Sequence, residues 1–240
     1  SLGKEEVIAK TTWEHTVNSI FSSNTENIML EYTATVDLDN PAINEKYQNK
    51  IIYDYTLKQF RQDGYSKDVK VLQADLSNVE RALQAVILSQ YRRKIAEKNK
   101  LHIKPVILMK SKTIAESQEI EQEFHQKITD LKIKDIDAIK SQSKGNILEK
   151  AFTYFEKEKI SFSNLITEIK EDFSEEKCIS VNSQNESEAK QLLVNSLEDQ
   201  NNEIRCIFAV DKLNEGWDVL NLFDIVRLYD TRDSKGNRPG

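Results

Sequence analysis

Two short, nearly continuous apolar runs constrain the fold of this chain more than any other feature. The first, Val106-Ile107-Leu108-Met109, follows Pro105, and the second extends from Ile204 to Val210. Strands buried on both faces of a parallel sheet have this pattern, whereas half-exposed strands alternate between apolar and polar residues. Helix-like and strand-like segments alternate around the two runs, which predicts an α/β fold with a parallel sheet and right-handed crossovers. The predicted order is a helix at 113–131, a strand at 177–181, a helix at 186–200, a short helix near 213–221 and a strand at 224–229.

Composition narrows the class of protein. The chain has only 6 glycines and 3 prolines in 240 residues, which favours long helices over an all-β design. Its net charge of -6 excludes a basic nucleic-acid coat, so any nucleic-acid contact needs a local basic surface. No apolar run approaches the ~20 residues of a membrane span, and the N-terminus is too polar for a signal peptide. We therefore expect a cytoplasmic protein without a membrane partner, with Cys178 and Cys206 as buried free thiols.

The first hundred residues have a different organisation. Residues 1–27 have helical spacing, Ile28 to Thr35 has the pattern of a short strand, and a strong breaker follows at 37–41. One helix and one strand cannot bury their own apolar faces, so we expect residues 1–36 to be the end of a larger domain and both chain ends to be incomplete. Residues 37–102 are predicted as a helical connection that includes one long helix at 76–99, and residues 132–175 as a helical insertion.

The long helix ends in a basic run, for which two interpretations stay open. Cations near a helix C-terminus interact favourably with the helix dipole, so the run is explained by a solvated helix end. The alternative is a surface that faces nucleic-acid phosphates. The residues are Arg92, Arg93, Lys94, Lys98, Lys100 and Lys104.

Three polar segments follow predicted strands, where α/β proteins place ligand contacts. Asn214-Glu215-Gly216-Trp217-Asp218 has a glycine that permits close backbone approach, although a tight turn with Asp218 as a cap explains it equally. Lys110-Ser111-Lys112-Thr113 offers hydroxyls, ammonium groups and free backbone N–H groups to a phosphate, or is a plain helix N-cap. Thr33-Ala34-Thr35 is an ordinary strand end when taken alone.

Together, and in this order, the segments resemble a known family. The string from Asp211 to Val219 is similar to motif V of superfamily 2 helicase-type motors, in particular the Res subunit of type III restriction enzymes. The segments ending in Thr35 and Thr113 resemble motifs III and IV, and residues 12–18 also look like the Res-type family. The resemblance implies a RecA-like second motor domain at 103–240. It implies ATP–DNA coupling by Thr33, Ala34 and Thr35, DNA-backbone contacts by Lys110, Ser111, Lys112 and Thr113, and nucleotide and DNA contacts by Asn214, Glu215, Gly216, Trp217 and Asp218.

Missing motifs limit what the chain does alone. It has no G-x-x-x-x-G-K-[ST] loop for a triphosphate and no D-E-x-H string for Mg²⁺. ATP and Mg²⁺ are therefore expected in the cleft of a longer parent, and this chain alone is expected neither to hydrolyse ATP nor to translocate. Two E-x-K tripeptides, Glu168-Ile169-Lys170 and Glu175-Glu176-Lys177, have nuclease spacing, but such tripeptides arise by chance in a chain so rich in Lys and Glu. The three scattered histidines suggest no metal site.

The sequence thus predicts part of an ATP-dependent DNA translocase or helicase subunit. By the resemblance, its partners are DNA and a DNA methyltransferase subunit that selects the site. Two alternatives stay open: a non-catalytic nucleic-acid-binding or protein-interaction module that docks through residues 132–175, and a superfamily 2 helicase outside restriction. A phosphate loop upstream and an arginine motif downstream in the parent would distinguish a motor from a module.

Overall fold

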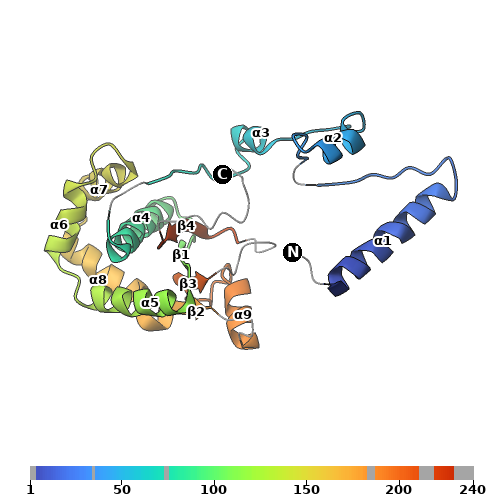
Figure 1. Cartoon of the computed structure of the whole chain (residues 1–240). Helices are drawn as coiled ribbons and strands as arrows, with labels where there is room; N and C mark the ends of the chain where they lie inside the picture. The colour runs from blue at the N-terminus through green and yellow to red at the C-terminus, as the bar shows by residue number, and fades with distance from the viewer. Residues whose placement is uncertain (1–3, 34–35, 73–75, 183–186, 211–218, 230–240) are drawn as a thin grey trace. The chain divides into compact units, whose positions relative to one another are not determined.

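The computed structural model describes residues 4–33, 36–72, 76–182, 187–210 and 219–229 (Figure 1). The chain forms two compact units, Ser1–Val69 and Lys70–Gly240, and each is described by itself. No helix in the described ranges combines the length and the apolar character that crossing a bilayer requires.

The described residues of the first unit include three helices joined by irregular segments. α1 spans Lys4–Ser22, α2 spans Pro41–Tyr47 and α3 spans Leu57–Gln62. Asn40 caps α2 and Pro41 occupies its first turn, so the predicted breaker serves as a helix start. Residues 28–33 have no regular secondary structure, so the strand predicted at 28–35 is wrong over this range. A lone extended segment has no neighbour with which to form a ladder of hydrogen bonds, which explains the difference.

The second unit is built on a four-stranded sheet. Its strands are β1 Val106–Ser111, β2 Cys178–Val181, β3 Cys206–Val210 and β4 Leu222–Arg227. The order is β2-β3-β1-β4, and every neighbouring pair is parallel. The predicted α/β class with a parallel, RecA-like sheet is confirmed. The two apolar runs of the sequence form the two inner strands, where both faces of the sheet are covered by other elements.

Helices cover both faces of this sheet, as Figure 1 shows. The described helices of this unit are α4 Asn78–Lys98, α5 Ile114–Thr129, α6 Ile133–Ser141, α7 Ile147–Lys157, α8 Phe162–Asp172 and α9 Glu188–Asn195, with a 3₁₀ turn, η1, at Glu175–Lys177. α6 and α7 pack on other helices, mainly α4 and α8. Buried residues of α4 to α8 form one hydrophobic core with Ile107, Met109, Cys206 and Phe208. On the opposite face, Val194 of α9 packs with Val106, Leu108 and Ile207. Successive side chains of a strand point to opposite faces of the sheet, so Ile107 and Met109 pack on one face and Val106 and Leu108 on the other.

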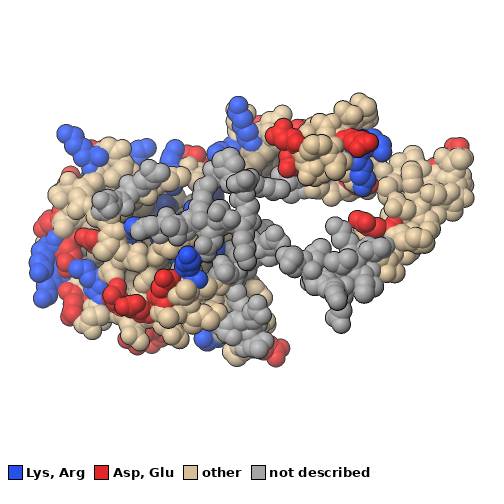
Figure 2. Space-filling view, in the orientation of Figure 1, with Lys and Arg blue, Asp and Glu red and all other residues tan. Residues whose placement is uncertain are grey.

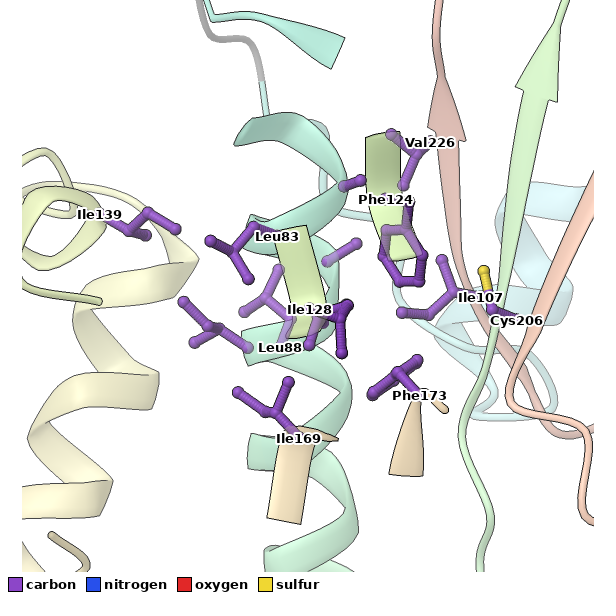
Figure 3. Close-up of a cluster of buried hydrophobic side chains, with 14 of the residues drawn as sticks. Leu83, Leu88, Ile107, Phe124, Ile128, Ile139, Ile169, Phe173, Cys206 and Val226 are labelled. Carbon is purple, nitrogen blue, oxygen red and sulfur yellow. The ribbon is translucent and has the colours of Figure 1, made fainter. Parts of the chain in front are cut away.

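Residues 132–175 share the main core with the sheet. Ile136, Leu148, Phe155, Leu165 and Ile169 from α6, α7 and α8 are each fully buried in the core that contains Leu83 and Leu88 of α4. Figure 3 shows Ile139 and Ile169 beside Leu83 and Leu88 of α4, with Phe124 and Phe173 closer to Ile107 and Cys206 of the strands. The insertion is therefore an integral layer of this unit, because removing its apolar faces would expose much of α4 and α5.

Candidate nucleic-acid interface

All four strands are parallel, so their carboxyl ends lie along the same side of the sheet, which we call its carboxyl edge. β1 ends in Lys110 and Ser111, and Lys112 and Thr113 lead directly into α5. β2 ends beside Asn182, whose side-chain oxygen accepts a hydrogen bond from Ser117 Oγ at 3.0 Å. This bond joins the end of β2 to the first turns of α5. The structure thus places the predicted segment Lys110–Thr113 at the edge where open α/β sheets bind ligands.

Ser111 is the buried member of this segment. Only 2% of it is exposed, and its Oγ atom has no hydrogen-bond partner among the described residues. A buried hydroxyl without a partner costs about 1–3 kcal/mol, so such atoms are uncommon in folded proteins. Lys112 and Thr113 next to it are exposed. The segment therefore combines a fixed polar atom with side chains that a ligand can reach.

Thr113 forms a capping box with Glu116. The Thr113 hydroxyl accepts from the Glu116 backbone N–H at 3.2 Å, and the Glu116 carboxylate accepts from the Thr113 N–H at 3.0 Å. The interpretation as a helix N-cap is therefore confirmed for Thr113. The capping box engages the N–H groups of Thr113 and Glu116, so these two do not donate to a phosphate while the box is formed. Glu116 also places a negative charge where a phosphate would approach.

Two further cations lie at this edge, and the sequence analysis did not single them out. Arg227, the last residue of β4, is in register with Lys110 on the neighbouring strand and is exposed. Arg81, from the first turn of α4, donates to the Arg227 carbonyl oxygen at 3.4 Å and to the Leu76 carbonyl oxygen at 3.0 Å. Only the strand order reveals this grouping, because Arg81, Lys110 and Arg227 are far apart in the sequence.

The motif V-like residues Asn214, Glu215, Gly216, Trp217 and Asp218 lie outside the described residues. Both ends of their segment are placed. Val210 pairs with Ser111 at the carboxyl edge, and Leu222 pairs with Val106 at the opposite end of β1. Val210, the last described residue before these positions, therefore lies beside Ser111.

The motif III-like residues belong to the first unit. Thr33 is exposed, whereas Ala34 and Thr35 lie outside the described residues. The role of Thr33, Ala34 and Thr35 in coupling ATP to DNA binding therefore stays a prediction.

Five of the six residues in the basic run at the end of α4 form ion pairs or hydrogen bonds within the second unit. Lys94 pairs with Glu168 at 2.5 Å and Lys98 with Glu158 at 2.5 Å, which ties α4 to α8 and to the residue that follows α7. The remaining contacts are Arg92 to Asp224, Arg93 to Asp172 and Glu97, and Lys104 to the carbonyl and side-chain oxygens of Asn202. Burial lowers the pKa of Lys104 to about 8. These contacts favour a structural role over a phosphate-facing surface.

A buried ionic cluster lies at the amino ends of the strands, and the sequence analysis did not identify it. Arg205 is 3% exposed and donates to Asp172 at 2.6 Å, to the Pro105 carbonyl at 3.0 Å and to Ser89 Oγ at 3.0 Å. Gln90 also donates to Asp172, at 2.6 Å. Burial by itself would raise the pKa of Asp172, but Arg205, Arg93 and Gln90 hold it below its ordinary value. The only signal in the sequence was a single arginine within an apolar run.

The nuclease interpretation gains no support. Glu168 and Lys170 lie on helix α8, where Glu168 pairs with Lys94 and Lys170 donates to the Thr129 carbonyl. Within the described ranges no three His, Cys, Asp or Glu side chains are grouped so that they could hold a metal ion.

Comparison with known proteins tests the resemblance to Res subunits. The chain is 35% identical, over an alignment of 256 residues, to the probable type III restriction-modification enzyme HindVIP Res subunit of Haemophilus influenzae. The alignment covers 96% of this chain and 49% of the relative. The resemblance to Res subunits is confirmed. The chain thus spans about half of the length of the Res subunit that it matches. No family model and no solved structure matches the chain.

Proposed function

We propose that this chain is part of an ATP-dependent DNA motor of the type III restriction class, and that the carboxyl edge of its sheet contacts the DNA backbone. The observation that carries the proposal is the similarity to a Res subunit over 96% of the chain, which includes the segment Lys110–Thr113. The position of this segment at the carboxyl edge of a parallel sheet supports it further. On this proposal, the chain acts as a component and not as a complete enzyme.

The same proposal assigns ATP and Mg²⁺ to a longer parent protein. The chain has no G-x-x-x-x-G-K-[ST] loop, and the described residues contain no group of three His, Cys, Asp or Glu side chains that could hold a metal ion. We therefore derive no catalytic step from the residues of this chain. The parent would use ATP to move along DNA. It would act with a methyltransferase subunit, because the relative is named as the Res subunit of a restriction-modification enzyme.

Charge distribution explains why DNA contact would be local. Lys and Arg side chains are interspersed with Asp and Glu on the face of the second unit that Figure 2 shows. A chain with net charge -6 offers no long-range attraction for a polyanion. Lys110, Lys112 and Arg227 gather at one edge, beside the buried Ser111 hydroxyl. Phosphate contacts of this kind position a protein on DNA without reading its sequence.

Replacing Lys112 and Arg227 together with alanine is expected to weaken DNA binding about tenfold and to reduce the salt slope by about 2, because each phosphate contact releases about one counterion. Affinity for a short labelled duplex would be measured by fluorescence anisotropy over a series of salt concentrations. The matched control is Lys150→Ala with Lys157→Ala, which removes two exposed cations from α7. Equal losses in both variants, or an affinity of the unmodified chain that does not change with salt, would contradict contact at this edge.

Glu116→Gln is expected to strengthen DNA binding about two- to fivefold at low salt. Glutamine can still accept the hydrogen bond from the Thr113 N–H, so the helix cap is kept while the negative charge is removed. The gain should shrink at high salt because the interaction is screened. Glu123→Gln, on the exposed face of the same helix, is the control and should leave affinity unchanged. A gain of equal size in the control would show that net charge alone is responsible.

The enzyme hypothesis and the module hypothesis differ in one measurement. DNA-stimulated ATP hydrolysis by the longer protein that contains this segment supports a motor, and its loss with Lys112→Ala and Arg227→Ala would link the activity to this edge. A longer protein without a G-x-x-x-x-G-K-[ST] loop or ATP hydrolysis would support a non-catalytic binding module instead.

A further inference from the structure

The two cysteines of the chain lie side by side, although 27 residues separate them in the sequence. Cys178 is the first residue of β2 and Cys206 is the first residue of β3, and the two are register partners in the parallel ladder. Neighbouring strands lie about 4.8 Å apart, which is within the range of Cα separations in disulfides. Both side chains point to the face of the sheet that α4, α5 and α8 cover. The sequence analysis treated them as isolated thiols, and the register shows that they are a pair.

The two thiols differ in access. Cys206 is fully buried beside Ile107, as Figure 3 shows, whereas Cys178 is partly exposed. Cys178 Sγ donates to the Phe173 carbonyl oxygen at 3.9 Å. Burial raises the pKa of the Cys206 thiol. An oxidant from solvent therefore meets Cys178 first, with Cys206 already placed behind it.

We propose that Cys178 and Cys206 form a reversible intrachain disulfide when the protein meets a peroxide. In the first step, hydrogen peroxide oxidises the Cys178 thiolate to a sulfenic acid, breaks the O–O bond and releases water after protonation. In the second step, Cys206 sulfur attacks the sulfenic sulfur, the S–O bond breaks, and the Cys206 proton leaves with the oxygen as a second water. Two thiols and one peroxide thus give one disulfide and two waters. A dithiol reductant reverses the change.

The position of the pair makes this reaction compatible with the fold. β2 is an edge strand, and Cys178 is its first residue, immediately after η1. A small approach of this strand end toward β3 disturbs fewer contacts than a movement of an inner strand would. The bond would join the exit of the helical insertion to the inner part of the sheet. It would also constrain the unfolded chain, which raises stability.

Tryptic mapping without reductant tests the proposal directly. Cleavage after Lys177, Lys190, Arg205 and Lys212 releases residues 178–190 and 206–212, and each peptide carries one cysteine. After peroxide treatment of the chain, we expect the two peptides linked, two hydrogens lighter than their sum, in the monomer band of a non-reducing gel. Dithiothreitol should separate them. The melting temperature of the oxidised monomer should rise by roughly 5–10 °C.

Two variants keep the test decisive. In Cys206→Ala, which suits a buried apolar site, the second step is blocked, so a dimedone adduct on residues 178–190 should accumulate several-fold above the unmodified chain. In Cys178→Ser, no linked peptide and no adduct on residues 206–212 are expected. The proposal is overturned if the unmodified chain shows only singly oxidised Cys178, if linkage occurs only between two chains, or if Cys206→Ala gives no more adduct than the unmodified chain.

Discussion

Asp172→Ala is expected to lower the free energy of unfolding by about 3–5 kcal/mol, the usual cost of leaving a buried charge without its partner. Asp172 is 6% exposed and accepts hydrogen bonds from Arg205 and Gln90, each at 2.6 Å, and from Arg93. Without the carboxylate, Arg205 stays buried with only neutral acceptors around it. The measurement is urea unfolding followed by circular dichroism, with Glu171→Ala, an exposed neighbour on the same helix, as control.

The size of this effect should depend on pH. The pKa of Asp172 in the folded chain lies below its ordinary value of 3.8. Its stabilising contribution is therefore complete above the unfolded-state pKa and is lost as pH falls through the folded-state pKa. The difference between the unmodified chain and Asp172→Ala should be constant near neutral pH and should narrow below about pH 4. A difference that does not change down to pH 2 would contradict the assigned ionic role.

A double replacement separates the charge from the packing. Asp172→Leu with Arg205→Met removes both ions and leaves apolar side chains in their place. Replacing a buried ion pair in this way is often neutral or stabilising, so we expect the double variant to recover more than half of the loss. A double variant as unstable as Asp172→Ala would show that the hydrogen bonds of Arg205 to Pro105 and Ser89 contribute most.

Phe124→Ala is also expected to cost about 3–5 kcal/mol, because it removes a large side chain from a closely packed core. Phe124 is 1% exposed on α5, and its ring lies 5.5 Å from that of Phe208 in β3 and 6.4 Å from that of Phe173. Both pairs are edge-to-face, an arrangement that adds to the effect of burial. The variant therefore opens a cavity where α5, the sheet and the end of α8 meet (Figure 3).

Chemical unfolding of Phe124→Ala, compared with Glu123→Ala, measures this cost. Glu123 is exposed on the same helix, so its replacement should change stability by less than about 0.5 kcal/mol. Phe124→Leu keeps most of the buried volume and should fall between the two. A loss below 1 kcal/mol for Phe124→Ala would mean that α5 does not pack against β3 as the structure has it.

Both predictions concern how the helical insertion is held. Asp172 lies at the end of α8, and Phe124 packs against Phe173 directly after it. Contacts of Lys94 and Lys98 with Glu168 and Glu158 attach the same helices to α4. The insertion is thus joined to the sheet by a buried ionic cluster, by aromatic packing and by surface ion pairs. The first two should dominate, because exposed ion pairs contribute at most about 1 kcal/mol each.

Some features of this protein follow from the sequence by itself. Continuous apolar runs predict the inner strands β1 and β3, and helical spacing predicts α4 and α5 to within two residues at each end. These signals can be read within one segment, because its hydrophobic period shows which of its faces are buried. The segment Lys110–Thr113 was predicted to follow a strand at 106–109, but β1 continues through Ser111, so only Lys112 and Thr113 lie after it. The capping box of Thr113 with Glu116 was not anticipated.

Other features were decided only by the tertiary structure. The strand order brings Arg227 beside Lys110 and Cys178 beside Cys206, and it gives Arg205 a partner on α8. The strand predicted at 28–35 is absent over 28–33, since a strand needs a neighbour that the local pattern does not supply. The basic run of α4 was ambiguous for a related reason. The sequence around a basic side chain does not show whether it faces solvent, a phosphate or a carboxylate. Here the fold supplies carboxylates from β4, α8 and the residue after α7. Partners distant in the sequence are chosen by packing, which no local pattern contains.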